Sequence, residues 1–247
     1  MVGYTNKAHS AALAPSKRAP QRIGSPSSTD LARIQDNISL PNLHFEIDDY
    51  CSDWVYPPDH FDYIHVRRLY GTVGDWPEFY KECYEYEKTP HPSLASFDCI
   101  ADSMPYSHLA PGAFLEHTET SVTLMSDDDS IPHGSAFQQS NALAIVCGQR
   151  FGKPMAIQNR IKGWITEAGF EDVVEEVFKW PLGDWPADPK LKDIGRWNAT
   201  LWNLGIEGWS LRLLTQTHGW TADEVRRWNK DIRNQITARK SHGYQLV

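Results

Sequence analysis

The sequence predicts an α/β domain with a largely parallel sheet. Segments in which apolar and polar residues alternate, the pattern of strands, take turns with segments in which apolar residues recur at helical spacing. Strands that alternate with helices favour parallel pairing through crossover connections. With 247 residues, of which 40% are hydrophobic, the chain is long enough for one domain with a sizeable core.

The first half of the chain carries three predicted strands and one helix. Residues 43–47 and 61–66 have the strand pattern, and a proline-rich turn cluster separates them. Asp75 is the predicted N-cap of the helix that follows. Residues 109–112 are predicted to form a turn, and residues 113–119 a third strand.

The second half is predicted to be more helical. A helix is expected to start at Pro154 and to end at Gly169, and residues 170–178 have a strand pattern. Two or three helices are expected within residues 190–239, the last opened by a capping box that starts at Thr221. We expect this C-terminal helical run to pack on the sheet as a cap.

Two segments depart from this rhythm. Residues 1–29 are rich in Ala, Ser and Pro, and they are basic and contain no acidic residue. They are predicted to be a disordered tail, and a mitochondrial presequence is the alternative. Residues 86–107 contain three prolines and no clear period, so an irregular insertion is predicted there. The amino acids of this segment are also compatible with codons that contain the splice signals of a retained intron. The folded domain is therefore expected to span residues 30–247.

Composition excludes several classes of protein. The net charge of −8 argues against a general nucleic-acid coat, and no apolar run is long enough to cross a membrane. No secretory signal is visible, so we expect a cytoplasmic or nuclear location, with no nucleic-acid or membrane partner. The four cysteines lie far apart in sequence, which predicts reduced thiols.

The sequence also lacks the short motifs of several chemistries. There is no phosphate-binding P-loop, no nucleophile elbow and no paired-histidine zinc helix. His117 and Glu119 share one strand face, but two groups do not make a metal site, and none is predicted. The acidic residues 127–129 favour a solvated loop, with a cation site as the alternative. No two of the 16 glycines stand as G-x-G.

Seven short runs occur in a fixed order along the chain. They are LPNLHFEIDD at 40–49, YPP at 56–58, FDYIH at 61–65, DWP at 75–77, LAPG at 109–112, KWPLGDWP at 179–186 and KDIGRWN at 192–198. Together they resemble the fungal S-adenosylmethionine-dependent methyltransferases of the LaeA-like class, which is associated with secondary metabolism. The resemblance covers about residues 30–240, apart from the insertion.

The resemblance implies a Rossmann-like class I methyltransferase fold that binds S-adenosyl-L-methionine at the carboxyl ends of its strands. It places Asp30 where a carboxylate holds the ribose hydroxyls, and Asp49, with Tyr50 beside it, where the adenine amino group is contacted. Val66 ends the strand where cofactor and a small-molecule acceptor meet. On the residues alone, Asp30 could equally be a helix N-cap or tail residue, and Asp49 a turn former.

Catalytic residues are harder to assign. His65 and His117 are candidates because they lie near strand ends and histidine titrates near neutrality. Three tryptophans of the helical run, Trp197, Trp202 and Trp209, could pack between helices or could line a substrate pocket.

The chain departs from the family pattern at its amino-terminal end. The family's first strand and its Gly-rich cofactor loop are missing, so the fold is expected to be incomplete there. Two functions stay open. The first is a methyltransferase of secondary metabolism. The second is a non-catalytic, methyltransferase-like accessory or regulatory protein with a protein partner. In the second case the cofactor site has been lost or the gene model is truncated.

Overall fold

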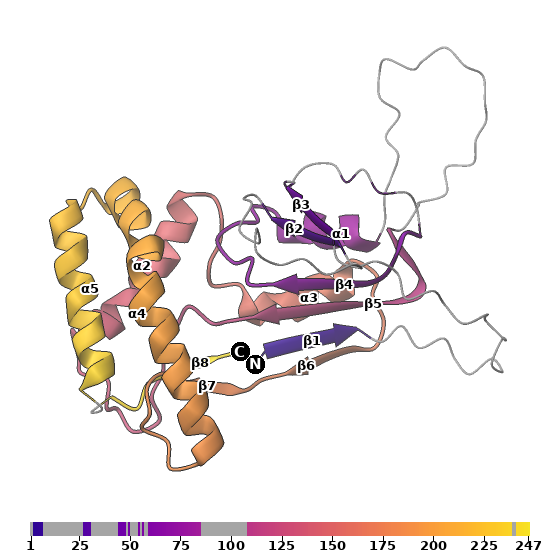
Figure 1. Cartoon of the computed structure of the whole chain (residues 1–247). Helices are drawn as coiled ribbons and strands as arrows, with labels where there is room; N and C mark the ends of the chain where they lie inside the picture. Colours follow the sequence, from indigo (N-terminus) through magenta and orange to yellow (C-terminus); the bar gives the residue numbers. More distant parts are fainter. Residues whose placement is uncertain are drawn as a thin grey trace, which may run out of the picture.

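A computed structural model describes residues 2–6, 27–30, 44–47, 49, 54, 56, 59–84, 108–238 and 241–247. The remainder of the predicted tail and the whole of the predicted insertion at 86–107 lie outside the described residues. The described part divides into a sheet with two helices packed on it and a group of three helices beside the sheet (Figure 1). This arrangement confirms the predicted α/β class.

The main sheet has four strands in the order β4-β5-β1-β6. Its strands are β1 (Val2–Asn6), β4 (Phe61–Arg67), β5 (Leu109–Glu119) and β6 (Val173–Glu176). β4 and β5 are parallel, whereas β1 lies between β5 and β6 and is antiparallel to both. The main sheet is therefore mixed rather than largely parallel, because β1 comes from the predicted tail, where no strand was expected.

Two smaller sheets complete the strand set. β2 (Ser27–Asp30) and β3 (His44–Ile47) pair in parallel, close to the predicted strand at 43–47. β7 (Lys179–Pro181) pairs antiparallel with β8 (Tyr244–Leu246), next to the last residue of the chain. The strand predicted at 170–178 is thus shorter, and a second short strand follows it.

One face of the main sheet is covered by α1 (Trp76–Tyr84) and α3 (Gln158–Glu167). Val66 and Leu115 point into this core, where they meet the buried side chains Trp76, Tyr80 and Ile161. The opposite face is open: in register across β4 and β5, Tyr63 is 50% and Phe114 37% exposed. Because side chains alternate along a strand, the polar and aromatic residues of this open face separate cleanly from the core residues.

Local signals explain the start and end of several helices. Asp75 accepts the backbone N–H of Glu78 at 3.1 Å, as its predicted N-cap role requires. α3 begins at Gln158 rather than Pro154, and Gly169 follows its end with φ 108°, a conformation that favours glycine.

The turn predicted at 109–112 is instead the beginning of β5. The pairing with β4 shifts there: Phe61 lies opposite Leu109, and Tyr63 opposite Phe114. Between these two pairs, β5 advances by five residues while β4 advances by two. Gly112, with φ 81°, lies within this irregular part of β5. The Pro-Gly signal marks a real local distortion, a bulge in β5 opposite the regular strand β4.

The helical group consists of α2 (Ala136–Arg150), α4 (Pro189–His218) and α5 (Ala222–Thr237). α4 packs against α2, α5 and β7. The predicted capping box is present: Thr221 and Glu224 bond reciprocally at the start of α5. No helix among the described residues is both long and apolar enough to cross a membrane.

Candidate functional site

The carboxyl ends of β4 and β5 lie side by side, because the two strands are parallel and Val66 is in register with His117. In Figure 1 this edge of the sheet faces the helices α2, α4 and α5. Ligands of open α/β sheets bind outside the carboxyl ends of the strands. A functional site is therefore expected at this edge of the sheet.

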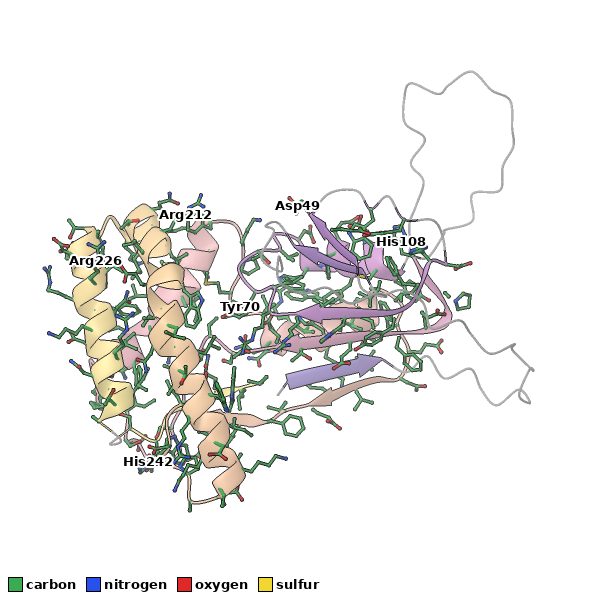
Figure 2. All side chains as sticks on the ribbon, in the orientation of Figure 1. Asp49, Tyr70, His108, Arg212, Arg226 and His242 are labelled. Carbon is green, nitrogen blue, oxygen red and sulfur yellow. The ribbon has the colours of Figure 1, made fainter. Side chains whose placement is uncertain are left out.

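Glu119, the last residue of β5, is completely buried. One carboxylate oxygen accepts the backbone N–H of Tyr70 at 3.0 Å, and the other accepts that of Thr120 at 2.8 Å. Tyr70 belongs to the loop that follows β4, and Figure 2 shows it at the end of the sheet next to the helices. Glu119 thus holds the loop after β4 against the end of β5.

His117 lies beneath this carboxylate and is also fully buried. Its Nδ1 is 2.5 Å from the Tyr80 hydroxyl, and its Nε2 is 3.4 Å from Glu119 Oε2. We assign the Nε2–H tautomer, in which Tyr80 donates to Nδ1 and the imidazole donates to Glu119. The indole of Trp76 stacks on the imidazole at 5.3 Å. Both ring nitrogens are therefore engaged within the core.

A cationic and an aromatic group border this edge. Arg68, with φ 56°, has its guanidinium 4.8 Å from the ring centre of Trp180, and partial burial lowers its pKa. Burial raises the pKa of Tyr70, and the negative charge of Glu119 adds to the effect. The buried hydroxyl of Thr120 has no hydrogen-bond partner among the described residues. A polar ligand could satisfy that hydroxyl here, since buried polar atoms normally have a partner.

The structure brings only part of the predicted site together. Val66 is buried opposite His117, but His65 points to the open face, where its ring stacks with that of Tyr63 at 6.1 Å. Alternation along β4 puts neighbours on opposite faces, so the two histidines do not face a common substrate position.

Two of the predicted cofactor residues, Asp30 and Asp49, lie in or next to the two-stranded sheet rather than in the main sheet. Asp30 ends β2 in register with Ile47 of β3, and Asp49 is an exposed residue two positions beyond β3 (Figure 2). Tyr50 lies outside the described residues. Asp30 thus lies at the carboxyl end of β2 and Asp49 just beyond the carboxyl end of its parallel neighbour β3.

No sequence pattern predicts a role for Arg68, Tyr70 or Thr120. Glu119 was noticed only as a neighbour of His117. The signal that could have found it is its position: a carboxylate at the buried end of a strand must be hydrogen-bonded. Of the predicted tryptophans, Trp202 donates to Gln245 at 3.0 Å and packs inside, whereas Trp197 is 75% exposed.

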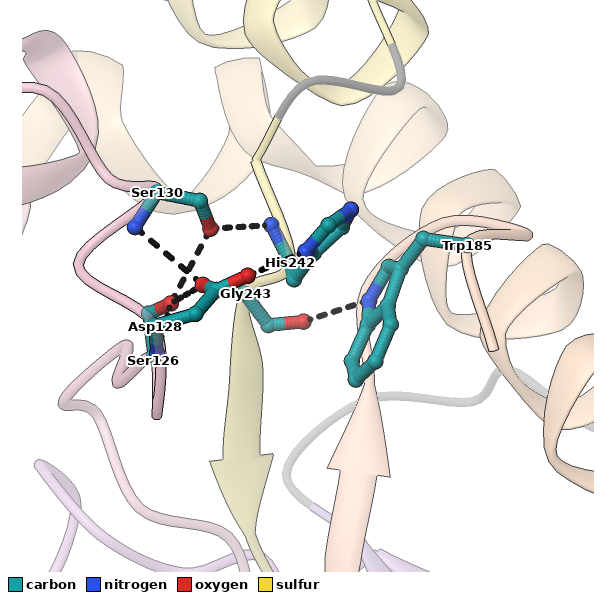
Figure 3. Close-up of polar contacts among 6 residues, drawn as sticks. All are labelled: Ser126, Asp128, Ser130, Trp185, His242 and Gly243. Atoms are coloured by element: carbon teal, nitrogen blue, oxygen red, sulfur yellow. Dashed lines mark hydrogen bonds and ion pairs between the residues drawn. The ribbon is translucent and has the colours of Figure 1, made fainter. Parts of the chain in front are cut away.

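The three aspartates of the acidic loop at 127–129 are exposed, as predicted, and two of them also contact the segment 241–247. Asp128 accepts from Ser126 at 2.6 Å and contacts His242 at 2.5 Å, while Ser130 accepts the backbone N–H of His242 (Figure 3). Asp127 accepts from Tyr244 at 2.7 Å and pairs with Lys179. Within the described ranges, no three His, Cys, Asp or Glu side chains gather as a metal site would require.

Curated relatives match this chain over most of its length. "Methyltransferase pytC" of Aspergillus terreus is 30% identical over 215 residues, which are 86% of this chain and 59% of the relative. "Secondary metabolism regulator LAE1" of Cochliobolus heterostrophus is 32% identical over 221 residues, 88% of this chain and 65% of the relative. The chain is a homologue of fungal methyltransferases and of LaeA secondary-metabolism regulators.

This homology confirms the resemblance drawn from the ordered motifs. A third relative, "Secondary metabolism regulator laeA" of Aspergillus fumigatus, is 26% identical over 221 residues, which are 88% of this chain and 53% of the relative. The chain thus spans between about half and two thirds of these LaeA-like relatives. No protein-family model matches the chain.

Proposed function

We propose that this LaeA-like chain is an S-adenosyl-L-methionine-dependent methyltransferase of fungal secondary metabolism that acts on a small-molecule acceptor. The observation that carries the proposal is the match to methyltransferase pytC over 86% of the chain. Methyl transfer needs the S-methyl group in line with a nucleophilic acceptor atom, and positioning supplies most of the catalysis.

The proposed fold is the Rossmann-like class I methyltransferase domain, spanning residues 30–247 with an insertion at 86–107. The parallel pairing of β4 with β5 and of β2 with β3 supports it. The helices α2, α4 and α5 would form a cap, because they lie beyond the carboxyl ends of β4 and β5 (Figure 1). Sequencing complementary DNA across codons 86–107 tests whether that insertion belongs to the mature message.

The domain is proposed to be incomplete at its cofactor end. Parallel strands are normally covered on both faces, yet on one face of the parallel pair β4 and β5 Tyr63 is 50% and Phe114 37% exposed. The absence of any G-x-G in the sequence supports the same proposal, because the family's glycines let the backbone approach the cofactor.

Each proposed cofactor contact has a chemical reason. The carboxylate of Asp30 would accept hydrogen bonds from both ribose hydroxyls, and that of Asp49 would accept one from the adenine amino group. Tyr50 and Val66 would complete the walls of the cofactor site. When bound, the cofactor supplies an electrophilic methyl group. His65 and His117 stay predictions as proton acceptors.

The second candidate function is an accessory or regulatory role without catalysis, in a complex with a protein partner. The similarity to LAE1 and laeA, which are named as secondary metabolism regulators, favours this role. A nuclear or cytoplasmic location suits either function.

Calorimetric titration of the purified chain with S-adenosyl-L-methionine tests the catalytic proposal. We expect micromolar binding that Asp49→Ala weakens about tenfold or more, as loss of a hydrogen bond to a buried ligand would. Asp223→Ala, an exposed carboxylate of α5, is the matched control and should bind as the unchanged chain does. No heat from a sample that unfolds cooperatively would contradict the catalytic proposal and leave the regulatory one.

A further inference from the structure

The carboxyl ends of β4 and β5 carry an arginine whose charge is not matched by a contacting acidic side chain. Arg68 directly follows β4, and its backbone N–H donates to the carbonyl of Thr118 in β5 at 3.1 Å. Within the described ranges its guanidinium makes no ion pair and no hydrogen bond, and it lies over the indole of Trp180. An aromatic face takes up none of the N–H donors of a guanidinium. The donors of Arg68 are thus free to bind a ligand.

The surroundings of Arg68 make this uncommitted charge costly. Partial burial lowers the pKa of Arg68, because the charged form has lost part of its hydration. The backbone of Arg68 also has a φ of 56°. The three other non-glycine residues with positive φ in the described structure are aspartates, which tolerate this conformation better than a long side chain does. Strain of this kind is common at functional sites.

Donors outnumber free acceptors around Arg68. The Tyr70 hydroxyl makes no hydrogen bond with another described residue, and the buried hydroxyl of Thr120 has no partner there either. The carboxylate between these two residues is that of Glu119, and both of its oxygens already accept backbone N–H groups. Because buried donors normally find an acceptor, this edge suits a ligand that accepts hydrogen bonds.

The balance of charge suits a ligand with one negative charge. Besides the phenol of Tyr70, which is neutral at about pH 7, the charged groups that shift the pKa of Arg68 are Arg67 and Glu119. Two arginines against one glutamate leave one positive charge in excess. A carboxylate carries one negative charge, and its planar oxygens match a guanidinium, whereas a phosphate group carries about −1.5 to −2. The edge therefore favours a carboxylate.

We propose that Arg68 and Tyr70 form a carboxylate-binding subsite at the carboxyl ends of β4 and β5. The guanidinium N–H groups and the Tyr70 hydroxyl donate to the carboxylate oxygens, and the indole of Trp180 holds the guanidinium in place. Two ligands of the proposed function would bring this group: an acceptor that is a carboxylic acid, and the amino-acid end of the cofactor. Only the choice between these sources rests on the proposed function.

Saturation-transfer NMR with benzoate tests the subsite independently of any activity. Benzoate should bind with a dissociation constant in the millimolar range, as a ligand of this size does. Benzamide, its neutral isostere, should bind about tenfold more weakly or not at all, because it lacks the charge. Equal binding of the two compounds would overturn the proposal, since the ring alone would then be recognised.

Replacements of Arg68 separate recognition of the charge from packing. Arg68→Met keeps the length of the side chain and should weaken benzoate binding about tenfold or more, and Arg68→Lys about threefold, because lysine keeps the charge and loses the planar fork. Arg67→Met removes the same charge from an exposed neighbour within β4 and should change the affinity less than about twofold. Thermal unfolding without ligand shows whether each variant is folded.

Tyr70→Phe provides a second test that leaves the charge in place. The change removes one hydroxyl donor and should weaken benzoate binding about threefold. It also decides the question if Arg68→Met does not fold. Unchanged benzoate affinity in both Arg68→Lys and Tyr70→Phe would contradict the subsite.

Two adenosine compounds separate the possible sources of the carboxylate. S-adenosyl-L-homocysteine has an amino-acid carboxylate, and 5′-methylthioadenosine has none. If the cofactor supplies the group, Arg68→Met should weaken binding of the first about tenfold and leave that of the second unchanged. If the acceptor supplies it, both compounds should bind this variant as they bind the unchanged chain, and benzoate alone should bind less tightly.

The same measurements distinguish failure of the subsite from failure of the proposed function. Affinities for benzoate and for S-adenosyl-L-homocysteine that are both unchanged in Arg68→Met would overturn the subsite and leave the methyltransferase proposal standing. Benzoate binding that depends on Arg68, without binding of either adenosine compound, would support the subsite and contradict the catalytic function.

Discussion

Two histidine–carboxylate pairs occur in the described structure, and their surroundings differ sharply. His117 and Glu119 are 3.4 Å apart with both side chains 0% exposed. His242 and Asp128 are only 2.5 Å apart, yet their side chains are 42% and 49% exposed. The longer contact should matter more to the fold, because burial makes an unpaired polar group costly whereas water readily replaces a surface partner.

The two pairs also hold different parts of the molecule. The buried pair joins α1, through Tyr80, to the end of β5 and to the loop after β4. The exposed pair attaches the segment 241–247 to the loop at 126–130. Breaking the first should disturb the candidate site, and breaking the second should loosen only the end of the chain.

The largest expected effect is that of Glu119→Gln. Both carboxylate oxygens accept backbone N–H groups, and an amide nitrogen would face one of these donors. We expect the free energy of unfolding to fall by about 2–3 kcal/mol, measured by urea denaturation. Glu116→Gln on the same strand, where the carboxylate bonds to the exposed Tyr63, is the control. Equal losses in the two variants would remove the contrast between buried and exposed carboxylates.

A smaller effect is expected for Tyr80→Phe. The change removes the hydroxyl that donates to His117 Nδ1, a hydrogen bond that is buried in the core. The expected loss is about 1–2 kcal/mol in the same denaturation experiment. Tyr63→Phe deletes an exposed hydroxyl and should cost about 0.5 kcal/mol or less. A larger loss from Tyr63→Phe would contradict the role assigned to burial.

The smallest expected effect belongs to Asp128→Asn, and it is present at neutral pH and disappears in acid, where the carboxyl of the unchanged chain is protonated. Hydrogen bonds from Ser126, from Ser130 and from His242 hold the pKa of Asp128 below its ordinary value of 3.8. A carboxyl with a lowered pKa stabilises the folded form above its unfolded pKa and loses this contribution as pH falls further.

The attachment of residues 241–247 should therefore be constant above about pH 4 and weaken below it. Hydrogen exchange of these amides against pH measures the effect, and Asp128→Asn should flatten the acid limb. Asp129→Asn, one residue further on, is the matched control. An unchanged acid limb in Asp128→Asn would show that other carboxylates tie down the C-terminal segment.

Local signals were enough for some elements and not for others. The N-cap Asp75 and the capping box at Thr221 were predicted because the bonds they make are within one turn of the chain. The sequence predicts a turn at the start of β5, because Pro111 and Gly112 carry the same local signal whether or not a partner strand is present. β1 was missed because its pairing with β5 and β6 is formed with residues more than 100 positions away.

By itself, the sequence determined the α/β class, the LaeA-like kinship and the nearness of His117 to Glu119, since these depend on order and spacing along the chain. The tertiary structure decided that His65 faces away from His117, that Tyr70 and Thr120 bind Glu119, and that Trp197 lies on an outer surface. Which groups are buried together depends on how distant segments pack, and the free energy of burial is not encoded in any one short segment.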